Sequence, residues 1–305
     1  MNIQRISKKA ISPLGFKYNY SIVIPEDPLA LVIFVHGLGD HIGRFKELAD
    51  RLADAGIASA MYDQRGCGLS DGPRGHVARF YDLVFDLSCF FHFAALKVSK
   101  DVPIFLIGHS MGSLVSLSYV ITHITPIWGV ITIAAAIEPT LKISHTKKRL
   151  LLSIAQFFPS FMVEDSITCE DTTRDQKEIE IHKADPLRQE KTSLSTASEA
   201  FTQIDFIKKM VRVLDIPLLM IHGSADKVCH AHGTLKLAMW SHSEKNTYKI
   251  YPGMYHDVLH DIGKEDVYDD IMEWLLCQIS FFNADKDSIK RRLFRTPHWK
   301  DANGV

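Results

Sequence analysis

Residues 103–112 read PIFLIGHSMG, an apolar run that ends in the motif G-x-S-x-G. The run has the length of a buried strand, and residues 111–123 have the composition of a helix. A sharp turn between a strand and a helix strains its serine, and small residues two positions before and after the serine relieve the crowding. We therefore expect Ser110 to project above a sheet at a helix N-terminus as a candidate nucleophile. The alternative is a purely structural Gly-Ser turn.

Apolar runs alternate with helical stretches on both sides of this motif. We expect strands at residues 29–36, 57–63, 103–108, 129–136, 217–222 and 247–251. We expect helices at residues 42–55, 81–100, 111–123, 231–241 and 267–281. Continuous apolar strands alternating with helices predict an α/β fold, in which a mostly parallel sheet has helices on both faces.

The alternation stops between residues 138 and 215, where no strand signal appears. We interpret residues 138–215, called the cap below, as a helical insertion into a core formed by residues 1–137 and 216–283. The apolar stretch 149–163 follows a basic flank, and it suits a cap helix that packs on the core or rests on a membrane surface. Residues 284–305 predict a basic, solvated tail, and the N-terminus a short surface arm.

Composition narrows the class of protein further. The chain has 305 residues, of which 46% are hydrophobic and 23% charged, and its net charge of −1 argues against a general nucleic-acid binder. No apolar run reaches membrane-spanning length. The five cysteines form no C-x-x-C pair, so we expect reduced thiols in a cytoplasmic protein, with peripheral membrane contact as an open alternative. The oligomeric state stays open.

A serine hydroxyl needs a base to take its proton, and a histidine base needs a carboxylate to orient it. In a hydrolase of this topology the order along the chain is serine, acid, histidine. Asp226 follows the predicted strand 217–222 in a G-x-x-D turn, and His256 follows the last strand and a glycine turn. We therefore predict a triad of Ser110, Asp226 and His256, and interpret His222 as a packed core residue.

A tetrahedral oxyanion needs two N–H donors aimed at its developing charge. Met111 comes directly after the candidate nucleophile and should supply one amide. The other should come from Leu38, in the glycine-rich loop after the strand that ends at His36.

Six blocks carry a resemblance to a known family: HGLGDHIGRF (36–45), DQRGCGLSDGPRGHV (63–77), GHSMGS (108–113), DPL (185–187), HGSADKVC (222–229) and GMYHDVLHD (253–261). Together they resemble the monoacylglycerol lipase and lysophospholipase branch of the α/β-hydrolases, a branch whose lid is likewise a helical insertion before the acid loop. The resemblance implies hydrolysis of one acyl ester of a lipid, without a metal or organic cofactor. It also implies substrate-pocket residues at Asp40, His41, Arg44 and His109.

Two positions depart from the family pattern. The family usually has histidine where Cys67 lies and often has a second glycine where Ser113 lies, which bears on pocket shape rather than on the triad. Cys229, three residues after Asp226, is either a small buried hydrophobe or a thiol whose modification inhibits the enzyme.

Other functions compete with a lipid esterase. A serine aminopeptidase would use the same triad but needs an acidic pocket for the substrate's amine, which the charged segment 164–180 leaves open. A binding protein without catalysis normally lacks a triad member, and none is missing here. His256 and His260 have the spacing of a zinc pair, but no glutamate completes H-E-x-x-H, so we expect no metal site.

Overall fold

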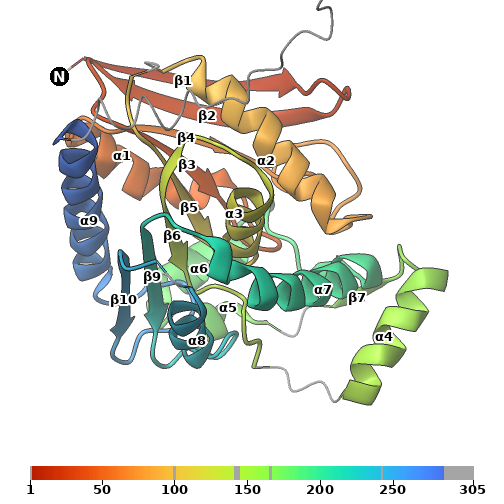
Figure 1. The fold of residues 1–305 in the computed structure, drawn as a ribbon. Helices are drawn as coiled ribbons and strands as arrows, with labels where there is room; N and C mark the ends of the chain where they lie inside the picture. Colours follow the sequence, from red (N-terminus) through yellow and green to blue (C-terminus); the bar gives the residue numbers. More distant parts are fainter. Residues whose placement is uncertain (1, 99–100, 141–144, 165–166, 242, 285–305) are drawn as a thin grey trace, which may run out of the picture.

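The computed structural model describes residues 2–98, 101–140, 145–164, 167–241 and 243–284, except for the side chains of residues 145–149. An eight-stranded sheet with the order β1-β2-β4-β3-β5-β6-β9-β10 forms its centre (Figure 1). β2 runs antiparallel to β1 and β4, and the remaining neighbours pair in parallel. The strands are β1 (Ile3–Ile11), β2 (Lys17–Pro25), β3 (Leu31–Val35), β4 (Ala58–Tyr62), β5 (Ile104–His109), β6 (Ile127–Ile133), β9 (Leu218–Gly223) and β10 (Asn246–Tyr251).

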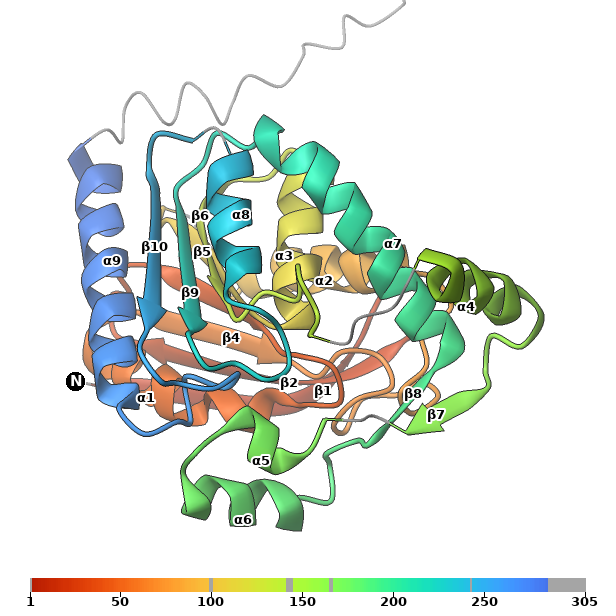
Figure 2. The ribbon, with the colours of Figure 1, turned by 90° about the horizontal axis from the view of Figure 1, so that it is seen from below.

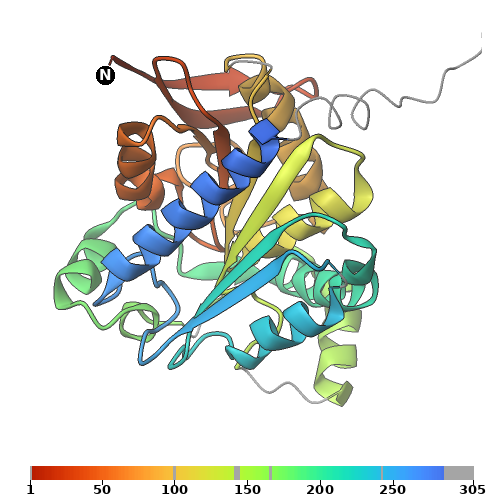
Figure 3. The same ribbon diagram turned by 60° about the vertical axis from the view of Figure 1, so that its left-hand side comes forward.

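Helices cover both faces of the sheet because its central strands are apolar on both sides. In β3, Leu31, Ile33 and Val35 join the core on one face, and Val32 and Phe34 join the core on the other. The first core packs against α2 (Phe80–Ala95), α3 (Met111–Thr122) and α8 (His232–Trp240). The second packs against α1 (Lys46–Asp54), which follows the short 3₁₀ helix η1 (Ile42–Phe45), and against α9 (Lys264–Ala284), which crosses the sheet in Figure 3. The predicted helix-covered α/β sheet is confirmed.

The N-terminal prediction is wrong. Residues 3–25 form an antiparallel hairpin on the edge of the sheet instead of a surface arm. The side chains of β1 are partly or fully exposed, so backbone hydrogen bonds to β2 hold the strand and no apolar pattern marks it. Lys8 and Lys9 lie on this edge, where charged side chains discourage pairing with another chain.

Between β6 and β9 the chain leaves the sheet and forms the cap. Its helices are α4 (His145–Phe157), α5 (Cys169–Thr172), α6 (Gln176–Ala184) and α7 (Leu194–Met210), and the 3₁₀ helix η2 (Val211–Val213) follows. Figure 2 shows α5 and α6 beyond the carboxyl ends of the strands, with α4 projecting from the body. α7 buries Ile204 and Ile207 in the first core.

The expectation that the cap holds no strand is also wrong. β7 (Met162–Glu164) pairs antiparallel with β8 (Lys191–Ser193) in a separate two-stranded sheet. Each strand has three residues, too few for an alternating pattern to be visible in the sequence. The side chains of the basic flank at 147–149 and all of the predicted tail beyond Ala284 lie outside the described residues.

Candidate active site

Ser110 occupies the strained turn between β5 and α3 that the sequence predicted. Its φ of 51° and ψ of −117° lie in a region that residues other than glycine rarely adopt. Two tertiary hydrogen bonds fix the turn: the Ser110 N–H donates to the Ile133 carbonyl at 2.8 Å, and the Ala136 N–H donates to the Ser110 carbonyl at 3.4 Å. The neighbouring strand therefore holds the serine in place.

Glycine is required on both sides of Ser110 because the backbones pack too closely for a side chain. A Cβ on Gly112 would lie 2.1 Å from the Val35 carbonyl oxygen, and one on Gly108 would lie 2.5 Å from the Gly112 carbonyl oxygen. This agrees with the predicted relief of crowding around the turn. Ser113 also fits here, since its buried hydroxyl donates to the Gly108 carbonyl at 2.6 Å.

Asp226 and His256 meet beside this turn, although 30 positions separate them in the chain. The His256 Nδ1–H donates to Oδ2 of Asp226 at 2.7 Å. The other carboxylate oxygen, Oδ1, accepts the backbone N–H groups of Val228 at 2.7 Å and Cys229 at 2.9 Å. With Nδ1 bound to the acid, the basic nitrogen of a neutral His256 is Nε2.

The electrostatics of the pair favour an ionised acid and make the histidine more basic than usual. Burial by itself raises the pKa of Asp226, but His256 and His222 outweigh it and lower that pKa. Burial by itself lowers the pKa of His256, but the carboxylate of Asp226 outweighs it and raises that pKa.

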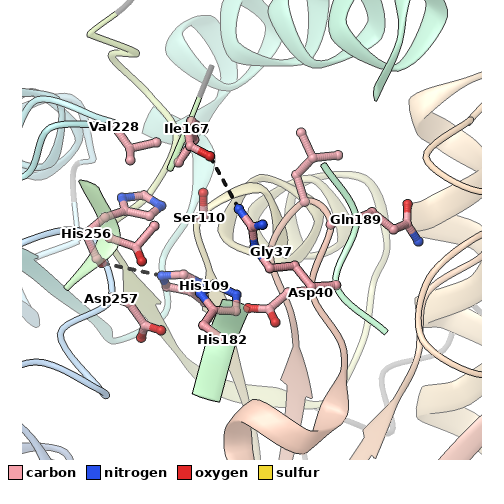
Figure 4. A pocket seen from close by; sticks show the side chains of 14 residues that line it. Gly37, Asp40, His109, Ser110, Ile167, His182, Gln189, Val228, His256 and Asp257 are labelled. Atoms are coloured by element: carbon pink, nitrogen blue, oxygen red, sulfur yellow. Dashed lines mark hydrogen bonds between the residues drawn. The ribbon is translucent and has the colours of Figure 1, made fainter. Parts of the chain in front are cut away.

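Ser110 and His256 line one small cavity of about 70 Å³ at the carboxyl ends of the strands (Figure 4). Most of the side chains in this polar cavity can form hydrogen bonds. Its other lining residues are Gly37, Leu38, Gly39, Asp40, His109, Ile167, Thr172, His182, Arg188, Gln189, Val228 and Asp257. Among the described residues, Nδ1 of His182 is buried here without a hydrogen-bond partner.

A second cavity of about 500 Å³ begins at the same serine and runs under the cap. Most of its lining is aliphatic, and it shares four lining residues with the polar cavity: Leu38, Ser110, Ile167 and Val228. α7 supplies much of one wall through Ala197, Ala200, Phe201 and Ile204. We call it the apolar cavity.

The predicted amide donors lie at the junction of the two cavities. Leu38 lines both of them, and Met111 is the first residue of α3 and lines the apolar one. His36 fixes the loop of Leu38, since its Nδ1–H donates to the Gly37 carbonyl at 2.8 Å and its Nε2 accepts the Gln64 N–H at 2.9 Å.

The four residues that the resemblance assigns to the substrate pocket divide into two pairs. Asp40 and His109 line the polar cavity, and burial lowers the pKa of His109 to about 4, so its ring is neutral. His41 and Arg44 are not among the lining residues of that cavity. They connect core and cap instead: the His41 Nε2–H donates to Asp185 at 2.7 Å, and Arg44 pairs with Asp257 at 2.7 Å and with Glu178 at 3.4 Å.

His222 differs from the sequence interpretation in one respect. It is fully buried at the end of β9, as expected of a core residue, but its Nε2 lies 2.8 Å from Oδ2 of Asp226. Asp226 therefore binds two histidines. Sequence reasoning missed this contact, although the spacing H-G-x-x-D across a strand end was visible in the chain.

Two cysteines, Cys67 and Cys229, and the pair His256 and His260 are the other candidates for a reactive thiol or a metal site. Burial raises the pKa of the Cys67 thiol to about 12 and that of Cys229 well above its usual range, so both stay protonated. His256 and His260 bind different carboxylates, Asp226 and Asp257. In the described part of the chain, no group of three or more histidine, cysteine, aspartate or glutamate side chains could hold a metal ion.

Comparison with known proteins places this geometry in a family. The family model described as serine aminopeptidase, S33, matches residues 26–263. The chain belongs to the serine aminopeptidase S33 family. A mouse relative, which is named monoglyceride lipase, is 31% identical to this chain over 235 residues. The match covers 76% of this chain and 77% of the relative. An uncharacterized abhydrolase domain-containing protein of Dictyostelium discoideum is 30% identical over 86% of this chain, which spans only 27% of that relative's length.

Solved structures agree with this S33 assignment at the level of the fold. The crystal structure of a soluble variant of monoglyceride lipase from Saccharomyces cerevisiae, in complex with a substrate analog, superposes with a TM-score of 0.81 at 22% identity. The match covers 89% of this chain and 94% of that one. The predicted α/β-hydrolase fold, the resemblance to monoacylglycerol lipases and the class of carboxylic ester hydrolase are confirmed. No helix among the described residues is long and apolar enough to cross a membrane.

Proposed function

We propose that this protein is a serine hydrolase that cleaves the acyl ester of monoacylglycerol. One observation carries the proposal: Ser110 stands where a small polar cavity meets a larger apolar one. An ester at that junction places its acyl chain in the apolar cavity and its head group in the polar cavity, so the shape suits a single-chain amphipathic lipid.

The proposed chemistry follows from the hydrogen bond between His256 and Asp226 and from the cavity that Ser110 and His256 both line. Ser110 attacks the ester carbonyl while Nε2 of His256 takes its proton, and Asp226 stabilises the imidazolium that forms. The amides of Leu38 and Met111 hold the oxyanion, a role in which each donor typically contributes about 3 kcal/mol. His256 then protonates the leaving alcohol, and a water that it activates releases the fatty acid from the acyl-enzyme.

The polar cavity supports glycerol as the head group in preference to a phosphocholine. It is small, and it offers the carboxylate of Asp40 as an acceptor to hydroxyl groups. Asp257, the other carboxylate, is already paired with Arg44 at 2.7 Å and with His260 at 2.9 Å. Lysophospholipid is the second lipid substrate that the same cavities admit.

Aminopeptidase activity is the second candidate, since the family description names it. An α-amino group would have to bind Asp40, the carboxylate of the polar cavity that makes no ion pair among the described residues. The apolar cavity favours the lipid over the peptide because a buried aliphatic lining offers little to a peptide backbone.

The cap surface supports contact with a lipid aggregate. Large apolar side chains on and just after α4 are exposed, namely Leu150, Ile154, Phe157, Phe158 and Phe161. Exposed aromatic and aliphatic residues on one projecting element are typical of a surface that inserts into the headgroup region of a membrane. We propose that residues 138–215 act as a cap through which the enzyme meets its substrate.

The test combines a fluorophosphonate probe with a panel of substrates. We expect the probe to label the wild-type protein and not S110A, and turnover to rank 1-monoacylglycerol above lysophosphatidylcholine and both above an aminoacyl amide. A folded wild-type protein that the probe does not label would overturn the serine mechanism. A higher turnover of the aminoacyl amide would move the assignment to an aminopeptidase.

A further inference from the structure

A second histidine shares the acid of the proposed triad. His222 Nε2 lies 2.8 Å from Oδ2 of Asp226, the same oxygen that binds Nδ1 of His256 at 2.7 Å. His222 belongs to β9 rather than to the loops of the cavities, and it lines neither the polar nor the apolar cavity. Any effect on catalysis must therefore pass through the residues that His222 contacts, and Asp226 is the one among them that belongs to the proposed triad.

The contacts of the His222 ring fix its proton. Nε2 also lies 3.0 Å from the Cys229 carbonyl oxygen, so both neighbours of Nε2 are acceptors and Nε2 must carry the hydrogen. Nδ1 lies 2.7 Å from the hydroxyl of Thr234, a fully buried residue of α8. The ring is thus held from α8 on one side and donates to the acid on the other.

We propose that His222 is a positioning residue, which holds the carboxylate of Asp226 in the orientation that His256 requires. The inference rests on the proposed triad. A carboxylate with one histidine can rotate about its Cβ–Cγ bond, whereas here two backbone N–H groups hold Oδ1 and two imidazoles hold Oδ2. The packing of β9 against α8 is thereby transmitted to the catalytic base.

Because His222 also binds Oδ2 of Asp226, it reduces the negative charge of the carboxylate that acts on His256. A donor on a carboxylate disperses its negative charge, so His222 weakens the attraction that raises the pKa of His256. Several other groups face His256 and stay constant when His222 changes: Asp257 beside it in the chain, Asp40 from the loop after β3, and the ring of His109 from β5.

Two substitutions separate positioning from simple burial. In H222Q, the amide nitrogen can reach the place of Nε2 and donate to Asp226, and we expect kcat/KM within about threefold of wild type. In H222N, the shorter amide reaches Thr234 but not Asp226. We expect kcat to fall about tenfold at unchanged KM, because orientation is lost and not binding. We also expect the acid limb of the pH profile to move upward by about half a pH unit.

A purely structural role predicts a different result. L52A, which removes a fully buried side chain of α1 far from the site, is the control for lost stability, and it should lower Tm without moving the acid limb. The proposal is overturned if H222N keeps the wild-type kcat and acid limb, or if H222Q and H222N lose activity equally. Should H222N not fold, T234V removes the hydroxyl that holds Nδ1 and thus the ring of His222, and an unchanged kcat in that variant has the same consequence.

Failure of the proposed function is recognised separately. If wild-type protein does not hydrolyse the ester, the proposed substrate is wrong. If S110A hydrolyses the ester, or if the probe does not label wild-type protein, the triad itself is wrong. If S110A is inactive, wild type is active and H222N behaves as wild type, only the role of His222 is wrong.

Discussion

The edge of the sheet that carries Ser110 and the cap differ in which side chains they bury and which they expose. At the sheet edge, polar side chains are buried, and the hydrogen-bond partners of Asp226 come from β9, from the loop after β9 and from the loop after β10. In the cap, apolar side chains such as Phe157 and Phe158 are exposed on and just after α4, while residues of α7 such as Ala200 and Phe201 form the wall of a cavity. This difference fits the proposed function, in which the core carries out the reaction and the cap brings the lipid to it.

A contact between a histidine and an aspartate occurs in both regions, and this gives the sharpest test of their difference. Asp226 binds His256 at 2.7 Å within the core, and Asp185 of the cap binds His41 at 2.7 Å. We expect D226N to lower kcat by about 10⁴-fold, because the amide favours the wrong tautomer of the histidine. We expect D185N to change kcat by less than about tenfold. Steady-state hydrolysis of a soluble ester measures both, and equal losses would contradict that difference.

The pH dependence of hydrolysis should distinguish His256 from His109 as the base. Catalysis needs neutral His256, whose pKa is raised above its ordinary value of 6.5. Below that pKa, kcat/KM should fall about tenfold for each pH unit, and the midpoint should lie above 6.5. The substrate should be an uncharged ester, so that its own ionisation does not contribute to the pH profile of kcat/KM. A midpoint near 4 would instead point to His109, whose pKa is about 4.

The apolar cavity should set the length of the acyl chain. Ala200 lies on α7 and lines that cavity, so the ring introduced by A200F occupies space that a long chain needs. We expect hydrolysis of long-chain monoacylglycerols to fall about tenfold while butyrate esters keep most of their rate. A184F is the matched control, because Ala184 is exposed at the end of α6 and lines neither cavity. Equal losses on short and long chains would show that the cavity does not hold the chain.

The smallest effect should come from the outer face of the cap. The triple variant F157S/F158S/F161S removes exposed rings, and we expect severalfold weaker binding to lipid vesicles with unchanged turnover of a soluble short-chain ester. I124S is the control, because Ile124 is fully exposed in the core segment that precedes β6. Vesicle co-sedimentation measures the difference. Equal behaviour of the two variants would remove the cap surface from the proposal.

The two regions also differ in how much of them the sequence predicts. Central strands such as β3 and β5 are visible as apolar runs, since burial on both faces requires an apolar residue at nearly every position. β1 is an edge strand with exposed side chains, and β7 and β8 have three residues each. Pairing stabilises these strands through backbone groups that every residue carries, so the amino-acid pattern contains no sign of them.

The candidate site shows the same limit. Ser110, Asp226 and His256 could be placed because each follows the end of a recognisable strand. The second contact of Asp226 could not be placed, because a buried histidine at a strand end looks the same in a sequence whether or not it reaches an acid. Only the turn after β9, which folds the Asp226 side chain back toward His222, brings the two side chains within 2.8 Å.

The anchoring of α7 has a consequence for how substrate enters. Ile204 and Ile207 are buried in the same core as α2 and α3, so a hinge movement of the whole cap would draw both into water at a cost of about 2 kcal/mol each. α4 is held less firmly: its Leu150, Ile154 and Phe157 face solvent, and among its described side chains only the small Ala155 is buried. Under the proposed function, we therefore expect movement of the cap to cost least at that outer corner, beside the exposed apolar residues proposed to contact lipid.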